Sequence, residues 1–141
     1  HIAAKINNRP ISLDKIKADF DFLKNKTDYL FVEGAGGYHV PLSETTTTSD
    51  LINLLNIPII LVVAIRLGCL NHTMLTIESI RNKNQKIFGW VANVLDPNMP
   101  FMKENIQYLK NKIVEPCFGE VPFIGDNNPL GAYEYLIWPS D

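Results

Sequence analysis

The chain has 141 residues, of which 46% are hydrophobic and 20% are charged, and its formal net charge is −2 at pH 7. These proportions are typical of a globular domain with an apolar core, and the length predicts a single domain over residues 1–141. The slight negative charge excludes a protein that binds nucleic acid through a basic surface, and two cysteines are too few for a disulfide scaffold.

The N-terminal residues contain no apolar segment typical of a secretory signal peptide. The longest apolar run, residues 57–65, includes Pro58 and is shorter than the roughly 20 residues that a membrane-spanning helix needs. We therefore expect a cytoplasmic protein with reduced cysteines and no membrane partner. The chain begins at His1 rather than methionine, which we interpret as a start inside a longer gene product.

Short apolar runs rich in strand-forming residues predict four β-strands. In chain order, they are residues 29–32, 59–65, 87–93 and 118–124. The intervening segments repeat apolar residues at spacings of three and four, which is typical of helices packed on a core. These helices are expected near residues 13–23, 51–55, 70–80 and 102–113.

Ser12 is the predicted N-cap of the first of these helices. We expect the next helix to start after Ser49 and Asp50 and to stop before Pro58. From Asp126 onward, the sequence predicts a loop that leads to a short closing segment. Alternating strands and helices predict an α/β fold, in which a parallel sheet carries helices on its faces and binds ligands at the carboxyl ends of its strands.

Glu33 directly follows the first predicted strand and precedes the glycine-rich segment 34–37. A carboxylate in this place suits Mg²⁺, which prefers oxygen ligands and nucleotide phosphates. The glycines allow a phosphate or a substrate to approach the main chain closely. A glycine-rich turn beside an incidental acid is an equally good interpretation, because short glycine-rich motifs are common.

Residues 68–72 follow the second predicted strand and begin a predicted helix. The free N–H groups of a helix's first turn form a site for anions, so a small carboxylate can bind there without a cationic side chain. Capping of the helix by Asn71 is the alternative interpretation, and the two are compatible.

Asn93 ends the third predicted strand, where its amide can both donate to and accept from an adenine edge. An Asx turn at the strand end is the alternative. Pro122, Phe123 and Ile124 end the fourth predicted strand. Their main chain can supply further contacts to a base and Phe123 an apolar wall, although a plain strand end is the default interpretation.

Five segments, taken in order, resemble the dethiobiotin synthetase family from about His1 to about Phe123. Each segment alone is a weak signal, whereas five in the same order with compatible spacing are specific. They are Val32-Glu33-Gly34-Ala35-Gly36-Gly37, Val40-Pro41-Leu42, Arg66-Leu67-Gly68-Cys69-Leu70-Asn71-His72, Gly89-Trp90-Val91-Ala92-Asn93 and Gly119-Glu120-Val121-Pro122.

The resemblance implies a homodimeric ligase of biotin biosynthesis with a P-loop NTPase-like parallel sheet and helices on both faces. Such enzymes use ATP, Mg²⁺ and CO₂ or bicarbonate to close the ureido ring of dethiobiotin on 7,8-diaminononanoate. One amine of the substrate forms a carbamate, which attacks the γ-phosphate, and the second amine then displaces phosphate.

Roles for individual residues also follow from the resemblance. Glu33 corresponds to the catalytic, Mg²⁺-binding glutamate, and Gly34, Ala35 and Gly36 to the loop beside the triphosphate, where Gly36 also contacts substrate. The positions that bind adenine correspond to Asn93, Pro122, Phe123 and Ile124. The turn that holds the substrate carboxylate, offered to the partner subunit, corresponds to Cys69, Leu70 and Asn71.

This sequence departs from the family pattern in several places. The family's N-terminal P-loop, which ends in Gly-Lys-Thr, has no counterpart here, so we expect the N-terminal strands to be missing and the chain alone to be inactive. A substrate-contacting tyrosine of some members aligns with Asn105, one turn from Tyr108, and an acidic residue near the base aligns with Pro129.

Two other classes of protein remain as alternatives. One is a related P-loop enzyme, such as a cobyrinic acid amidating synthase or a ParA-like ATPase, against which segments 66–72 and 89–93 argue. The other is a fragment without catalytic activity that dimerises or binds nucleotide weakly.

Overall fold

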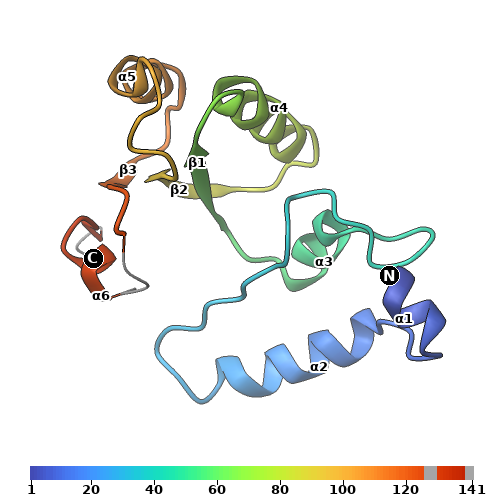
Figure 1. Ribbon diagram of the computed structural model, residues 1–141. Coiled ribbons are helices and arrows are strands. Elements are labelled where there is room, and N and C mark those ends of the chain that lie inside the picture. Colours follow the sequence, from blue (N-terminus) through green and yellow to red (C-terminus); the bar gives the residue numbers. More distant parts are fainter. Residues whose placement is uncertain (126–129, 139–141) are drawn as a thin grey trace. The chain divides into compact units, whose positions relative to one another are not determined.

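The computed structural model describes residues 1–125 and 130–138 (Figure 1). The chain divides into two compact units, residues 1–57 and residues 58–141. The expectation of one domain over residues 1–141 therefore stays a prediction. Residues 126–129 and 139–141, which belong to the predicted C-terminal loop and closing segment, lie outside the described residues. Among the helices described, none is long and apolar enough to span a membrane.

The first unit contains three helices, α1 (Ile2–Ile6), α2 (Leu13–Lys24) and α3 (Thr48–Leu55). The predicted cap of α2 is confirmed, because the Ser12 hydroxyl accepts from the Lys15 N–H at 3.2 Å. Helix α3 starts earlier than its expected start after Ser49 and Asp50. Thr47 is its N-cap, and the Asp50 carboxylate accepts from the Thr47 N–H at 2.8 Å.

The predicted strand over residues 29–32 is wrong, since this segment has irregular backbone in the structure. Aromatic residues favour strands where their side chains pack against a neighbouring surface. In this unit, Tyr29 is 73% exposed and Phe31 is 67% exposed. The local preference for a strand is therefore not supported by burial.

The second unit contains a parallel three-stranded sheet in the order β1-β2-β3. Its strands are β1 (Ile59–Ile65), β2 (Ile87–Val94) and β3 (Cys117–Val121), and its helices are α4 (Cys69–Asn82), α5 (Met102–Lys112) and α6 (Leu130–Tyr133). This confirms the predicted parallel α/β architecture. Strand β3 ends at Val121 instead of Ile124, where Pro122 has no N–H to donate to a neighbouring strand.

Both faces of this sheet are packed. On one face, β1 and β2 pack against α4 and α5 around Trp90, which is fully buried with Ile65 and Leu109. On the other face, Val91 of β2 and Phe118 of β3 pack with apolar residues of the C-terminal segment. Successive side chains of a strand point to opposite faces, so the apolar run of β2 serves both layers.

The C-terminal segment also pairs with the backbone of β3. Gly119 and Leu136 form an antiparallel bridge, and the Ile137 N–H donates to the Phe118 carbonyl at 2.7 Å. The rings of Phe118 and Trp138 lie with their centroids 5.6 Å apart. This close approach depends on glycine, because a Cβ at Gly119 would overlap the carbonyl oxygen of Tyr135.

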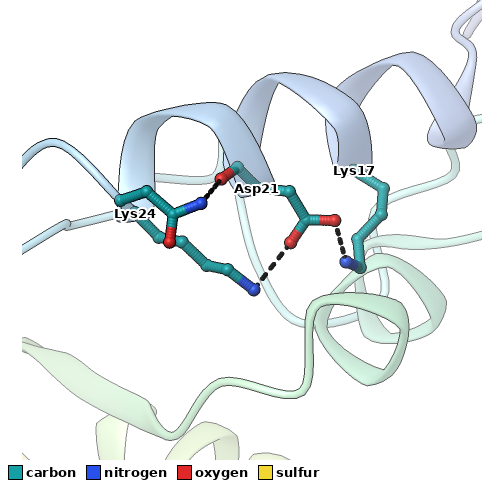
Figure 2. A network of polar contacts seen from close by, with 4 residues as sticks. Lys17, Asp21 and Lys24 are labelled. Carbon is teal, nitrogen blue, oxygen red and sulfur yellow. Dashed lines mark hydrogen bonds and ion pairs between the residues drawn. The ribbon is translucent and has the colours of Figure 1, made fainter.

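Helix α2 carries a small, partly buried charge network, shown in Figure 2. The Asp21 carboxylate pairs with the ammonium of Lys17, one turn earlier, and with that of Lys24 at 2.9 Å. These are spacings at which helical side chains are neighbours. The hydrogen bond from Lys17, followed by that from Lys24, lowers the pKa of Asp21 below its ordinary value of 3.8.

The stability of α2 should therefore depend on pH in acid. A carboxyl group with a lowered pKa in the folded state stabilises the fold above its ordinary value of 3.8, and this contribution is lost as the pH falls through the lowered pKa. We expect the protection of amides within residues 13–24, taken relative to the intrinsic exchange rate at each pH, to decrease in that acidic range. Residue-resolved hydrogen exchange measures the effect, which Asp21→Asn should remove and Asp19→Asn should preserve.

Replacement of Gly119 tests how closely the C-terminal segment packs on β3. The overlap of an added Cβ with backbone cannot be relieved by rotating a side chain, so Gly119→Ala should destabilise the fold by about 1–3 kcal/mol. Urea unfolding measures this loss. Gly125→Ala is the matched control, because its Cβ would only meet Phe123 at 3.9 Å, and equal stability of the two variants would contradict the packing described.

Candidate functional site

The register of the sheet brings the ends of its three strands level. Asn93 of β2 lies opposite Ala64 of β1 and opposite Val121 of β3. Neighbouring strands lie about 4.8 Å apart, so residues that follow β1 and β3 lie on either side of Asn93. The structure therefore places Asn93 and the segment that begins at Pro122 at one edge of the sheet, as the sequence predicted.

Asn93 is partly buried and shares a sheet face with Val91, two residues earlier in β2. Val91 belongs to the apolar cluster that also receives Ile124. Phe123 is 50% exposed, so part of its ring remains available to a ligand. This edge combines an amide side chain, irregular main chain after β3 and an exposed aromatic ring.

The turn after β1 leads directly into α4. Gly68 is the N-cap with φ of +90°, a conformation that glycine adopts without strain. The Cys69 N–H donates to the Arg66 carbonyl at 3.0 Å, which closes the turn. The N–H groups of Leu70 and Asn71 lie in the first helical turn, which helix geometry leaves without intrahelical acceptors. Gly68, rather than Asn71, therefore occupies the capping position.

An open cavity of about 170 Å³ lies between β1 and the face of α4. Of the predicted carboxylate-binding residues, Cys69 lines it, whereas Leu70 and Asn71 are not part of its wall. The wall consists of four successive residues of β1 together with one residue of the turn and four residues of α4. They are Leu61, Val62, Val63, Ala64, Arg66, Cys69, His72, Thr73 and Thr76.

Arg66, His72 and Thr73 were not predicted from the sequence as site residues. A signal for the helical ones exists, because Cys69, His72, Thr73 and Thr76 follow the spacing of one helix face. Arg66 adds a cation beside this face. The cavity wall therefore carries more polar groups than the sequence motif alone suggests.

Asn105, which aligns with the family's substrate-contacting tyrosine, lies near the start of α4. Its side-chain oxygen is 4.0 Å from the Cys69 sulfur, and its side-chain nitrogen donates to the Phe101 carbonyl at 2.7 Å. Tyr108 is 44% exposed on the same helix, α5. The structure thus assigns Asn105 to a polar contact with the turn region and leaves Tyr108 accessible.

Glu33 and the glycine-rich loop belong to the first unit. Glu33, Gly34, Ala35 and Gly36 are all exposed. Gly36 has φ of +97°, and a Cβ there would come within 2.7 Å of the Val40 Cγ2 atom. The loop therefore requires glycine at residue 36 for two reasons, its backbone conformation and the close approach of Val40.

Each of the two units carries its own set of candidate residues. The second unit brings Asn93, residues 122–124 and residues 69–71 to the ends of its parallel strands. The first unit presents Glu33 with the loop 34–36. The metal-binding and catalytic roles of Glu33, and the ligand contacts of the other residues, stay predictions.

Comparison with known proteins identifies the chain's relatives. The model of an AAA domain family matches residues 1–129. An ATP-dependent dethiobiotin synthetase from Cellvibrio japonicus is 47% identical over 86% of this chain and 54% of its own length. Enzymes of the same name from Aromatoleum aromaticum and a Janthinobacterium species are 40% and 38% identical, over 99% and 96% of this chain.

The chain spans 62% of the length of the Aromatoleum protein and 58% of the Janthinobacterium protein. It thus matches somewhat more than half of each curated relative. The parallel sheet with packed faces agrees with the P-loop NTPase-like α/β fold that the family match indicates. From the family match, the chain belongs to this AAA domain family, and most of its length is similar to dethiobiotin synthetases.

Proposed function

We propose that this chain is part of an ATP-dependent dethiobiotin synthetase, a ligase of biotin biosynthesis. The enzyme closes the ureido ring on 7,8-diaminononanoate with CO₂ or bicarbonate, ATP and Mg²⁺, and works as a cytoplasmic homodimer. The observation that carries the proposal is 47% identity over 86% of the chain to an enzyme of that name. The arrangement of polar groups at the strand ends supports it independently.

We assign the nucleotide base to the edge beside Asn93. An amide offers both a donor and an acceptor, as the adenine edge does, and the main chain of residues 122–124 adds further polar groups. Phe123, half exposed, supplies a surface against which a planar base can pack. These contacts recognise the base and leave the reacting phosphate free for other residues.

The start of α4 is the proposed site of the substrate carboxylate. The first-turn N–H groups of Leu70 and Asn71 favour an anion through hydrogen bonds and the helix dipole. Cys69 connects this turn to the neighbouring cavity, whose wall includes Arg66. In the proposed homodimer, this turn binds the carboxylate of the substrate held by the partner subunit.

Glu33 fits the metal that the family requires. Mg²⁺ is commonly held by one or two carboxylates, substrate phosphates and water, so a single exposed glutamate beside an open glycine loop is a suitable ligand. When bound, the ion neutralises charge on the phosphates during phosphoryl transfer. The chain itself supplies the carboxylate oxygen of Glu33. At residues 34–36 it also supplies a backbone that phosphates can approach closely.

The role of Glu33 can be tested in the intact natural protein. Glu33→Gln keeps the size of the side chain and removes its charge, so we expect turnover at limiting Mg²⁺ to fall roughly a hundredfold or more, in line with the loss of a charged ligand from a reacting site. Steady-state rates across a Mg²⁺ titration measure this. Glu44→Gln is the control, since Glu44 is another exposed acid of the same unit, paired with Lys5 at 2.8 Å, and equal rates for both variants would refute the metal role.

The cross-subunit carboxylate site makes substrate affinity depend on assembly. Affinity for 7,8-diaminononanoate should fall when the protein is diluted below the dissociation constant of its dimer, because binding linked to assembly follows mass action. Sedimentation equilibrium and calorimetric titration over the same protein concentrations would reveal this linkage. A monomer with undiminished affinity would contradict the site as assigned.

A further inference from the structure

The buried hydroxyl of Thr48 contacts the glycine-rich loop directly. Thr48 is the first residue of α3 and is only 8% exposed. Its hydroxyl oxygen lies 2.9 Å from the Gly37 carbonyl and also within hydrogen-bond distance of the Tyr38 carbonyl. A hydroxyl has a single proton, so these two carbonyls share one donor.

The same hydroxyl accepts from the Val40 N–H at 3.1 Å. The Thr48 N–H, in turn, donates to the Val40 carbonyl at 2.9 Å. Both backbone groups of Val40 are therefore bonded to Thr48. The side chain of Val40 also lies against Gly36. The hydrogen bonds from Thr48 to Val40 therefore hold this side chain next to the glycine-rich loop.

Thr48 is itself fixed by its place in the helix. The preceding Thr47 is the N-cap of α3, and its N–H and hydroxyl both bond to the Asp50 carboxylate at 2.8 Å. The neighbouring Ser49 is fully buried. A contact from this ordered helix start to a glycine-rich segment restricts backbone that glycine would otherwise leave free.

The other hydroxyls of this threonine-rich segment have different partners. Ser43 contacts the hydroxyls of Thr45 and Thr46, at 3.5 and 2.7 Å, and accepts from the N–H groups of both. These bonds close the turn over residues 43–46. Thr48 differs from them because its contacts reach 8 to 11 residues back along the chain.

We propose that Thr48 is a positioning residue for the loop that follows Glu33. Its hydroxyl fixes the backbone of residues 37–40 and thereby the course of the chain from Glu33 through Gly36. This inference rests on the proposed function, in which Glu33 is the ligand of Mg²⁺. Thr48 touches neither metal nor substrate in this role and acts only through the loop.

Three substitutions in the intact natural protein separate positioning from general stability. Thr48→Val removes the hydroxyl while keeping the branched shape, Thr48→Ser keeps the hydroxyl, and Thr48→Cys leaves a weaker donor and acceptor. Thr45→Val is the matched control, an equal change at an exposed residue of the same segment. Each variant is compared by residue-resolved amide exchange without nucleotide and by the Mg²⁺ dependence of turnover.

For Thr48→Val, we expect exchange of the Val40 amide to accelerate roughly tenfold, the size typical of a buried group that loses its partner. The Mg²⁺ concentration for half-maximal turnover should rise severalfold, with little change in the rate at saturating Mg²⁺. Thr48→Ser and Thr45→Val should match the natural protein, and Thr48→Cys should lie between. Amide exchange in residues 59–65, far along the sequence, reports whether the fold is retained.

Several outcomes would overturn the proposal. Natural exchange at Val40 in Thr48→Val would show that the hydroxyl does not fix the loop. Faster exchange with an unchanged Mg²⁺ dependence, while Glu33→Gln is impaired, would show that the loop's position does not matter to the metal. If Glu33→Gln is also unchanged, the proposed metal role fails, whereas the amide exchange still decides whether Thr48 fixes the loop. If Thr48→Val does not fold, Thr48→Cys decides the same questions by the same two measurements.

Discussion

Parallel pairing of β2 between β1 and β3 is the constraint on which the second unit depends. It sets Asn93 level with Ala64 and Val121, so the residues after each strand meet at one edge of the sheet. Parallel strands need a crossover between them, and α4 and α5 provide these crossovers while covering one face. A site at this edge is therefore a consequence of the topology rather than of any single motif.

Local signals in the sequence were sufficient to predict much of this architecture. The apolar run Ile59–Ile65 forms β1, whose residues Val63 and Ile65 are buried in the core. Ser12 caps α2 through a hydrogen bond to Lys15, three residues later in the chain. Features that depend on distant partners were not predictable. The strand-forming residues Tyr29, Phe31 and Val32, for example, remain exposed. The end of β3 at Val121 is different, because its cause is local: Pro122 cannot donate to a neighbouring strand.

The candidate site likewise combines features that could be predicted from the local sequence with features that could not. Asn93 lies near the carboxyl end of β2, as predicted, because this position depends only on the strand and its direction, whereas its contact with a base stays a prediction. The cavity wall of Arg66, His72 and Thr73 was missed, since the face of α4 that meets β1 is defined only once both elements are packed. The start of α3 shows the limit even for local rules. Thr47, Ser49 and Asp50 are all good N-caps, and the choice of Thr47 depends on the bond it forms with Asp50.

The candidate residues of the two units differ in what they require from side chains. At the start of α4, the proposed anion ligands are backbone N–H groups, which are aligned by the helix itself and need no particular residue. Glu33 is the opposite case, because a single carboxylate must be presented from a loop whose glycines restrict it little. Such a loop depends on contacts from more ordered structure, and the buried hydroxyl of Thr48 at the start of α3 supplies them. If Glu33 is the metal ligand, as proposed, its position is therefore expected to depend on a residue outside the glycine-rich motif.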